Sequence, residues 1–315
     1  GQYFEEDPAP DSETSGEFKR KASSIRNWIG QSGFAAEAGR YHLFVAWNCP
    51  WAHRALLTRA LLGLEDAISV SYAKPRRTAQ GWVFDADGAF DDPLLGVMAV
   101  HEVYGRHRPA YTGRITVPVL WDKQTGVIVN NESADIVRML NAAFGGDLYP
   151  DDLAPQIDEW NELIYSTFNN GVYRAGFART QEAYDKGVAD VFATMNKVEA
   201  HLAGSRYLCG DRFSEADLRM FPTLARFDVA YHYAFKCNLH RLMDYPNLWG
   251  YAREIYQMRG VAQTVNFDIY KQGYFSPSEL RNPLGIVPAG PVIDWDAPHG
   301  RGCTNGACFG MVSCA

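Results

Sequence analysis

The chain has 315 residues, a net charge of −7, 47% hydrophobic and 13% aromatic residues, and six cysteines. This length and apolar content suffice for two globular domains, whereas the negative charge disfavours a general nucleic-acid binder or a surface attracted to anionic lipid. No apolar run approaches the roughly 18 residues of a membrane helix, and so few cysteines in so long a chain are typical of reduced thiols. Small molecules are therefore the expected partners.

The first residues bear on localisation. Residues 1–16 are acidic and polar, unlike a secretory signal, so a cytoplasmic protein is expected. Because the sequence begins with Gly1, a removed organellar presequence stays open as an alternative.

Composition and apolar periodicity divide the chain into four segments. Its start is polar, with aromatic anchors at Phe18 and Trp28, and predicts an arm laid over the body of the protein. The expected segments are an N-terminal arm (1–38), a thioredoxin-like domain (39–150), an all-helical domain (151–275), and a C-terminal extension and tail (276–315).

The second segment has the order β-α-β followed by β-β-α, which is the thioredoxin-like order of a mixed sheet. Its predicted elements are a strand at 41–47, a helix at 50–63, a strand at 67–73, strands at 116–121 and 127–130, and a helix at 132–141. A Gly/Asp/Pro-rich insertion separates the third element from the fourth.

Beyond residue 155 the apolar spacing becomes helical. The stripes are Ile157, Trp160, Ile164 and Phe168, and then Tyr184, Val188, Val191, Met195, Val198 and Leu202. A capping box at 214–217 predicts a helix through Phe227, and Pro246 introduces another over 247–258. The fold class is therefore α/β plus all-α, with a thioredoxin-like domain followed by a helical bundle.

Cys49 stands between the first predicted strand and the first predicted helix, with Pro50 suited to the first helical position. The first-turn amides and the helix dipole stabilise a thiolate there, and cysteines so placed have pKa values from roughly 3.5 to 7.5. We therefore expect a reactive, substantially ionised thiol. The alternative is a small buried apolar residue.

No second thiol is available in the same motif, because Ala52 stands where a Cys-x-x-Cys pair would have its partner. A reaction begun at Cys49 must then be completed by an external thiol, and glutathione is the obvious candidate.

Two further segments fit a glutathione site. Pro118 lies inside a predicted strand, and a cis Val117–Pro118 bond would turn the Val117 backbone toward the cysteinyl amide of glutathione; a trans proline on an edge strand is the alternative. Asn131, Glu132 and Ser133 follow a strand and open a helix, where free N–H groups and a hydroxyl suit the γ-glutamyl carboxylate and Glu132 suits its ammonium.

In this order, these segments resemble the Xi class of glutathione transferases, the glutathionyl-hydroquinone reductases. The resemblance covers most of residues 17–291. It runs through Gly39–Leu43, Cys49–Arg54, Gly81–Phe84, Thr116–Asp122, Asn130–Ser133, Asn169–Tyr173, Asp244–Gly250 and Asn282–Pro288.

The resemblance implies a glutathione transferase fold and a homodimer that removes glutathione from glutathionylated hydroquinones, with glutathione as co-substrate and no metal. Cys49 would attack the glutathione sulfur, and a second glutathione would resolve the mixed disulfide. Trp82, Val117, Glu132 and Ser133 would bind glutathione, and Arg114 is either a partner for its carboxylate or a surface cation. Tyr173 and Tyr274 are the expected proton donors, and Tyr207 and Tyr231 are further candidates for the substrate pocket.

Two other functions stay open: an omega-type thiol transferase or dehydroascorbate reductase, and a non-catalytic carrier of aromatic ligands. His53 and His232 are expected to be structural. Cys303, Cys308 and Cys314 have spacings that fit no zinc site, so a flexible tail without metal is expected.

Overall fold

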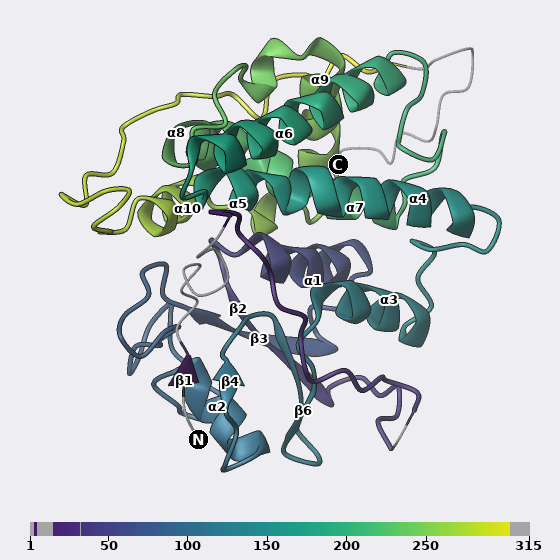
Figure 1. Cartoon of the computed structure of the whole chain (residues 1–315). Helices are drawn as coiled ribbons and strands as arrows, with labels where there is room; N and C mark the ends of the chain where they lie inside the picture. The colour runs from purple at the N-terminus through teal and green to yellow at the C-terminus, as the bar shows by residue number, and fades with distance from the viewer. Residues whose placement is uncertain (1–2, 5–14, 32, 303–315) are drawn as a thin grey trace.

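The computed structural model describes residues 3–4, 15–31 and 33–302 of the chain. The three tail cysteines, Cys303, Cys308 and Cys314, lie outside the described residues. Two bodies are stacked in Figure 1, a sheet domain below and a helical domain above, and the chain passes from the first to the second after helix α3.

A four-stranded mixed sheet forms the centre of the first domain. The strands lie in the order β3-β2-β5-β6, with β2 parallel to β3 and antiparallel to β5, and with β5 antiparallel to β6. The elements are β2 (Tyr41–Ala46), α1 (Pro50–Leu61), β3 (Ile68–Ala73), α2 (Val100–His107), β4 (Gly113–Arg114), β5 (Val119–Asp122), β6 (Val127–Asn130) and α3 (Ser133–Ala143). The predicted thioredoxin-like order is confirmed. A short strand β1 (Tyr3–Phe4) pairs with β4.

Two details of this domain differ from the sequence-based prediction. Strand β5 begins at Val119 instead of residue 116, because Pro118 has no N–H to give to a ladder and its bond to Val117 is cis. Helix α2 falls inside the segment predicted as an irregular insertion. Its buried residues Val100, Val103 and Tyr104 have helical spacing, but the surrounding glycines and aspartates obscure so short a pattern.

The second domain is helical, as predicted. It contains α4 (Ala154–Ile164), η1 (Tyr165–Asn169), α5 (Gly171–Gly176), α6 (Gln181–Leu202), α7 (Glu215–Arg226), η2 (Phe227–Tyr231), α8 (His232–Ala234), η3 (Leu242–Asp244), α9 (Pro246–Tyr256), η4 (Ala262–Thr264) and α10 (Phe267–Tyr274). The capping box predicted at Ser214 is present at the start of α7. The segments η1 and η2 are π-helical turns, which apolar spacing did not predict.

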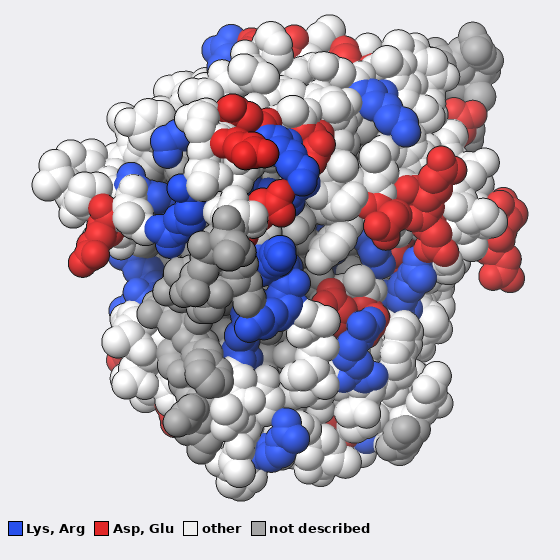
Figure 2. All heavy atoms as spheres, viewed as in Figure 1, with Lys and Arg blue, Asp and Glu red and all other residues white. Residues whose placement is uncertain are grey.

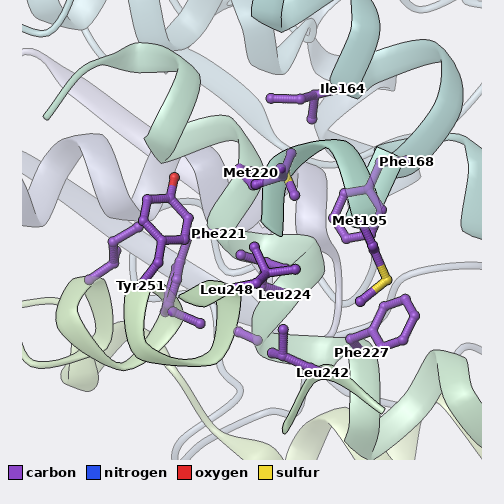
Figure 3. Close-up of a cluster of buried hydrophobic side chains, with 14 of the residues drawn as sticks. Ile164, Phe168, Met195, Met220, Phe221, Leu224, Phe227, Leu242, Leu248 and Tyr251 are labelled. Carbon is purple, nitrogen blue, oxygen red and sulfur yellow. The ribbon is translucent and has the colours of Figure 1, made fainter. Parts of the chain in front are cut away.

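The predicted apolar stripes supply part of the core of the helical domain, with Trp160 and Tyr184 only partly buried at its edge. Figure 3 shows Phe168, Met195, Leu224 and Phe227 converging with their neighbours from α4, α6, α7 and α9. Leu57 of α1 and Val137 of α3 belong to the same core cluster. The helices of the sheet domain therefore bury apolar side chains against the helical domain. This buried contact holds the two domains together at the candidate site.

The N-terminal arm crosses from one domain to the other. Phe18 packs against Phe177 at 5.4 Å between ring centres, whereas Arg26 forms a bidentate pair with Asp135 at the start of α3. Figure 1 shows this segment as the dark purple tube that passes in front of both domains, and Figure 2 shows Lys and Arg side chains along the same path. Among the described residues, no helix is long and apolar enough to cross a membrane.

Candidate functional site

Cys49 is the N-cap residue of α1, as the sequence predicts. Its backbone is extended (φ −80°, ψ 115°), Pro50 is the first helical residue, and no acidic residue stands in the first turn. The positive end of the helix dipole is therefore not offset by a carboxylate of its own turn, which favours a negative charge on sulfur. The residue is 9% exposed, so access to the thiol is narrow.

The Val117 carbonyl lies next to this thiol. Cys49 Sγ donates to Val117 O at 3.5 Å, and the Val117–Pro118 bond is cis, which decides between the two conformations that the sequence left open. Because β5 begins only at Val119, the Val117 main chain precedes the strand and its carbonyl faces the sulfur instead of a ladder partner. The structure thus brings together the two residues expected at the cysteinyl part of glutathione.

The start of α3 offers partners for both charged groups of an amino acid, its carboxylate and its ammonium. Glu132 is the N-cap residue, and its carboxylate accepts from Ala134 N at 3.2 Å and from Ser23 Oγ of the arm at 2.9 Å. Ser133 follows as the first helical residue and is 3% exposed. Helix N–H groups with a hydroxyl suit a carboxylate, whereas the Glu132 carboxylate suits an ammonium.

Trp82 and Arg114 lie on the sheet domain. Trp82 is buried in the same core cluster as Cys49 and Val117, and the Arg77 guanidinium lies 5.3 Å from its ring centre. Arg114 belongs to β4, three residues before Val117, and is half-buried. Arg114 therefore lies close to the cis turn along the chain, whereas Trp82 shares only the buried core with it.

Three tyrosine hydroxyls meet on the helical side of the domain interface. Tyr274 Oη lies 2.8 Å from Tyr173 Oη and 2.9 Å from Tyr231 Oη, so it is the central member of the chain. Tyr173 and Tyr274 are partly exposed, whereas Tyr231 is fully buried. Burial raises the pKa of all three phenols well above the ordinary value, so each holds its proton at neutral pH.

The hydroxyl chain faces the thiol. Trp51, two residues after Cys49, packs against Tyr173 with ring centres 6.3 Å apart. Burial, then Tyr231 and then Cys49 raise the pKa of Tyr173, so a negative charge on the sulfur lies within electrostatic reach of this phenol. The Tyr173 side chain therefore lies near the N-terminus of α1, where Cys49 stands.

The structure does not bring Tyr207 to this site. Its hydroxyl donates to Glu254 Oε1 at 2.9 Å, and its ring packs against Phe213 and Tyr251 within the helical domain. The reason is its position in the loop ahead of α7, at the end of that helix opposite η2 and Tyr231. Tyr231 belongs to the hydroxyl chain but has no exposed surface, so it supports Tyr274 from the protein interior and does not line a pocket.

Sequence reasoning missed Arg226, which lies under the turn ahead of Cys49. It is fully buried and donates to Trp47 O at 2.7 Å and to His53 Nδ1 at 2.9 Å. The only signal was a charged residue closing an otherwise apolar helical stripe. His53 is structural, as expected, since both of its ring nitrogens are bonded, the second to Thr264 Oγ1 at 2.8 Å. No cluster of three metal-ligating side chains occurs among the described residues.

Two family models match the chain: the glutathione S-transferase N-terminal domain over residues 48–143 and the glutathione S-transferase C-terminal domain over residues 181–254. Among curated proteins, glutathionyl-hydroquinone reductase YqjG of Escherichia coli is 50% identical over 305 residues, covering 91% of this chain and 93% of that protein. Glutathionyl-hydroquinone reductase PcpF of Sphingobium chlorophenolicum is 47% identical, covering 88% and 90%.

Solved structures agree with these matches. The glutathione-bound structure of YqjG superposes with a TM-score of 0.85 at 49% identity, covering 88% of this chain and 96% of that one. The glutathione transferase Xi of Phanerochaete chrysosporium superposes with a TM-score of 0.84 at 46% identity, covering 88% and 93%. With a thioredoxin-like sheet, a helical domain and a cysteine at the N-terminus of α1, the chain belongs to the glutathione S-transferase family and, within it, to the Xi class.

Proposed function

We propose that the protein is a glutathionyl-hydroquinone reductase, which converts a glutathionylated hydroquinone and glutathione into the free hydroquinone and oxidised glutathione. The observation that carries this proposal is the Cys49 thiol at a helix N-terminus, opposite linked tyrosine hydroxyls. Two curated relatives, at 50% and 47% identity, bear this activity in their names.

The first step forms a mixed disulfide. The Cys49 thiolate attacks the sulfur of the glutathionyl group, the carbon–sulfur bond to the ring breaks, and the electron pair of that bond takes a proton at the ring carbon. A second glutathione, as its thiolate, then attacks the glutathione sulfur held by Cys49. Oxidised glutathione leaves, and the Cys49 thiolate is restored.

The hydroxyl chain supplies the proton at the ring. Tyr274 has one hydrogen to give, so the chain can run from Tyr231 to Tyr274 to Tyr173, with each hydroxyl donating to the next. In that direction the hydrogen of Tyr173 stays available for the substrate without breaking either of the two contacts. General acid catalysis of this kind contributes about 10²- to 10⁴-fold.

Glutathione would lie along the sheet domain. Its γ-glutamyl end meets Ser133 and Glu132 at the start of α3, its cysteinyl amide pairs with the Val117 main chain, and Trp82 packs beside it. Arg114 is assigned to its glycine carboxylate. The pairing of Glu132 with Ser23 adds the arm to the wall of this site.

The proposal includes a homodimer in the cytoplasm that acts on small molecules and not on nucleic acid or a membrane. This part rests on the class resemblance and on the net charge of −7. Light scattering after size-exclusion chromatography tests the oligomeric state.

The deciding experiment incubates the protein with glutathionyl-menadiol and glutathione and follows free menadiol by chromatography under nitrogen. Menadiol release that is lost in Cys49→Ala supports the proposal. Binding of the conjugate without release would favour an aromatic ligand carrier. Turnover confined to dehydroascorbate or glutathione mixed disulfides would favour an omega-type thiol transferase.

A further inference from the structure

Arg226 joins the helical domain to the turn that carries the reactive thiol. It closes α7, and its guanidinium donates to Trp47 O at 2.7 Å and to Asn48 O at 3.1 Å. These are the two residues that precede Cys49 in the chain. A single buried side chain therefore fixes the position of the N-cap of α1.

The other contacts of Arg226 hold α1 and α10. One N–H donates to His53 Nδ1, and the opposite ring nitrogen of His53 is bonded to Thr264. Burial, helped by the charge of Arg226, lowers the pKa of His53 well below its ordinary value, so the ring stays neutral and accepts this bond. The guanidinium carbon also lies 3.8 Å from the ring centre of Tyr270, a close cation–π contact.

The charge of Arg226 has no anionic side chain against it in the described part of the chain. The guanidinium contacts carbonyl oxygens, a neutral imidazole and an aromatic ring. A buried cation without a counter-ion is costly, so an anion formed near the fully buried guanidinium during the reaction would be stabilised by it. The titratable groups that face it are His53 of α1, Tyr173 of α5, Tyr231 of η2, and Tyr270 and Tyr274 of α10.

We propose, on the basis of the function proposed above, that Arg226 is a positioning residue with two effects. It holds the Trp47–Asn48 turn so that Cys49 stays at the N-terminus of α1, and its charge stabilises the tyrosinate that remains after the hydroxyl chain has given a proton to the ring.

The proton balance follows the geometry of the chain. Tyr173 gives its proton to the ring carbon as the carbon–sulfur bond breaks, Tyr274 reprotonates Tyr173, and Tyr231 reprotonates Tyr274. Tyr270, whose ring the guanidinium contacts, lies one helical turn before Tyr274 on α10, and Tyr231 closes η2, the turn that directly follows Arg226. Against the opposing effect of burial, Tyr270, Tyr274, Tyr231 and Tyr173, in this order, raise the pKa of Arg226. The negative charge therefore moves toward the guanidinium. The thiol proton of the second glutathione restores the neutral tyrosine when that glutathione becomes a thiolate.

The test compares Arg226→Lys, Arg226→Met and Tyr231→Phe with a matched control, Tyr251→Phe. Tyr251 is also fully buried and hydrogen-bonded, at 2.8 Å from Asp217, but it lies outside the hydroxyl chain. Each variant is examined by single-turnover menadiol release from glutathionyl-menadiol between pH 6 and 9. Each is also examined by the pH dependence of Cys49 alkylation with iodoacetamide, which needs no turnover.

Arg226→Met should slow menadiol release by about 10²- to 10³-fold and move the alkylation profile upward by about one pH unit. Arg226→Lys should keep part of the rate because it keeps the charge. Tyr231→Phe should slow release at least tenfold with an unchanged alkylation profile, and Tyr251→Phe should change neither measurement.

A folded Arg226→Met protein with wild-type release and alkylation profiles would overturn the proposal. If that variant does not fold, wild-type release in Tyr231→Phe, or full activity in Arg226→Lys with no change in alkylation, would overturn it instead. Failure of the wild-type protein to release menadiol would count against the proposed function. The alkylation profile of Arg226→Met would still decide the positioning role.

Discussion

Replacing Tyr274 by Phe should cost more stability than replacing Tyr173 by Phe, although both variants should lose a similar amount of activity. The Tyr274 hydroxyl contacts both other members of the chain, so its removal takes from the fully buried Tyr231 hydroxyl the partner that lies 2.9 Å away. An orphaned buried hydroxyl costs about 1–3 kcal/mol. Tyr173→Phe keeps the Tyr231–Tyr274 contact and removes a hydroxyl from a partly exposed residue, so its cost should stay near 0.5–1.5 kcal/mol.

The rate should fall in both variants by roughly ten- to a thousand-fold, because either change interrupts proton delivery to the ring. We expect the double variant to be little slower than Tyr274→Phe, since the two residues act in one chain. Rapid-quench measurement of menadiol release gives the rates, and urea unfolding gives the free energies. Equal destabilisation in the two single variants, or multiplicative rate losses in the double variant, would refute the linked-hydroxyl reasoning.

Three further predictions concern the thiol, the excluded tyrosine and acid stability. Cys49→Ala and Cys49→Ser should abolish menadiol release while glutathione affinity stays nearly intact. Wild-type enzyme that receives the conjugate without free thiol should gain one glutathione mass on Cys49, because Ala52 provides no resolving thiol. An internal disulfide found by peptide mapping would contradict this. Tyr207→Phe should release menadiol at the wild-type rate, since its hydroxyl is engaged by Glu254; a tenfold loss would return it to the pocket. Burial lowers the pKa of His42 to about 4, below the unfolded value near 6.5. Between these two values the unfolded chain binds a proton that the folded protein does not. The free energy of unfolding therefore falls as the pH drops from about 6.5 to 4, by up to roughly 1.4 kcal/mol per pH unit. Urea unfolding of His42→Gln should show a shallower dependence, and an identical slope would show that other groups dominate.

Much of the sheet domain could be predicted because its signals are local. The strand–helix junction at Cys49, the cis bond before Pro118 and the cap at Glu132 each depend on a few consecutive residues and their backbone needs. Helix α2 was missed because its apolar pattern spans only two turns. Arg226 was missed because nothing in a sequence marks which arginine will be buried under a loop 178 residues away.

The meeting of the tyrosines was foreseen only through resemblance, and the two π turns explain why apolar spacing could not foresee it. In a regular helix each residue turns the next side chain by about 100°, so one extra residue in a turn reorients everything after it. The turn η1 precedes α5 and Tyr173, and η2 ends at Tyr231 itself. Phe168 of η1 stacks on Phe227 of η2 at 6.0 Å, so the two irregular turns pack together. Since a stripe read at three- and four-residue intervals assumes the regular helix, it assigns these side chains to the core and gives no reason for their hydroxyls to converge on Tyr274.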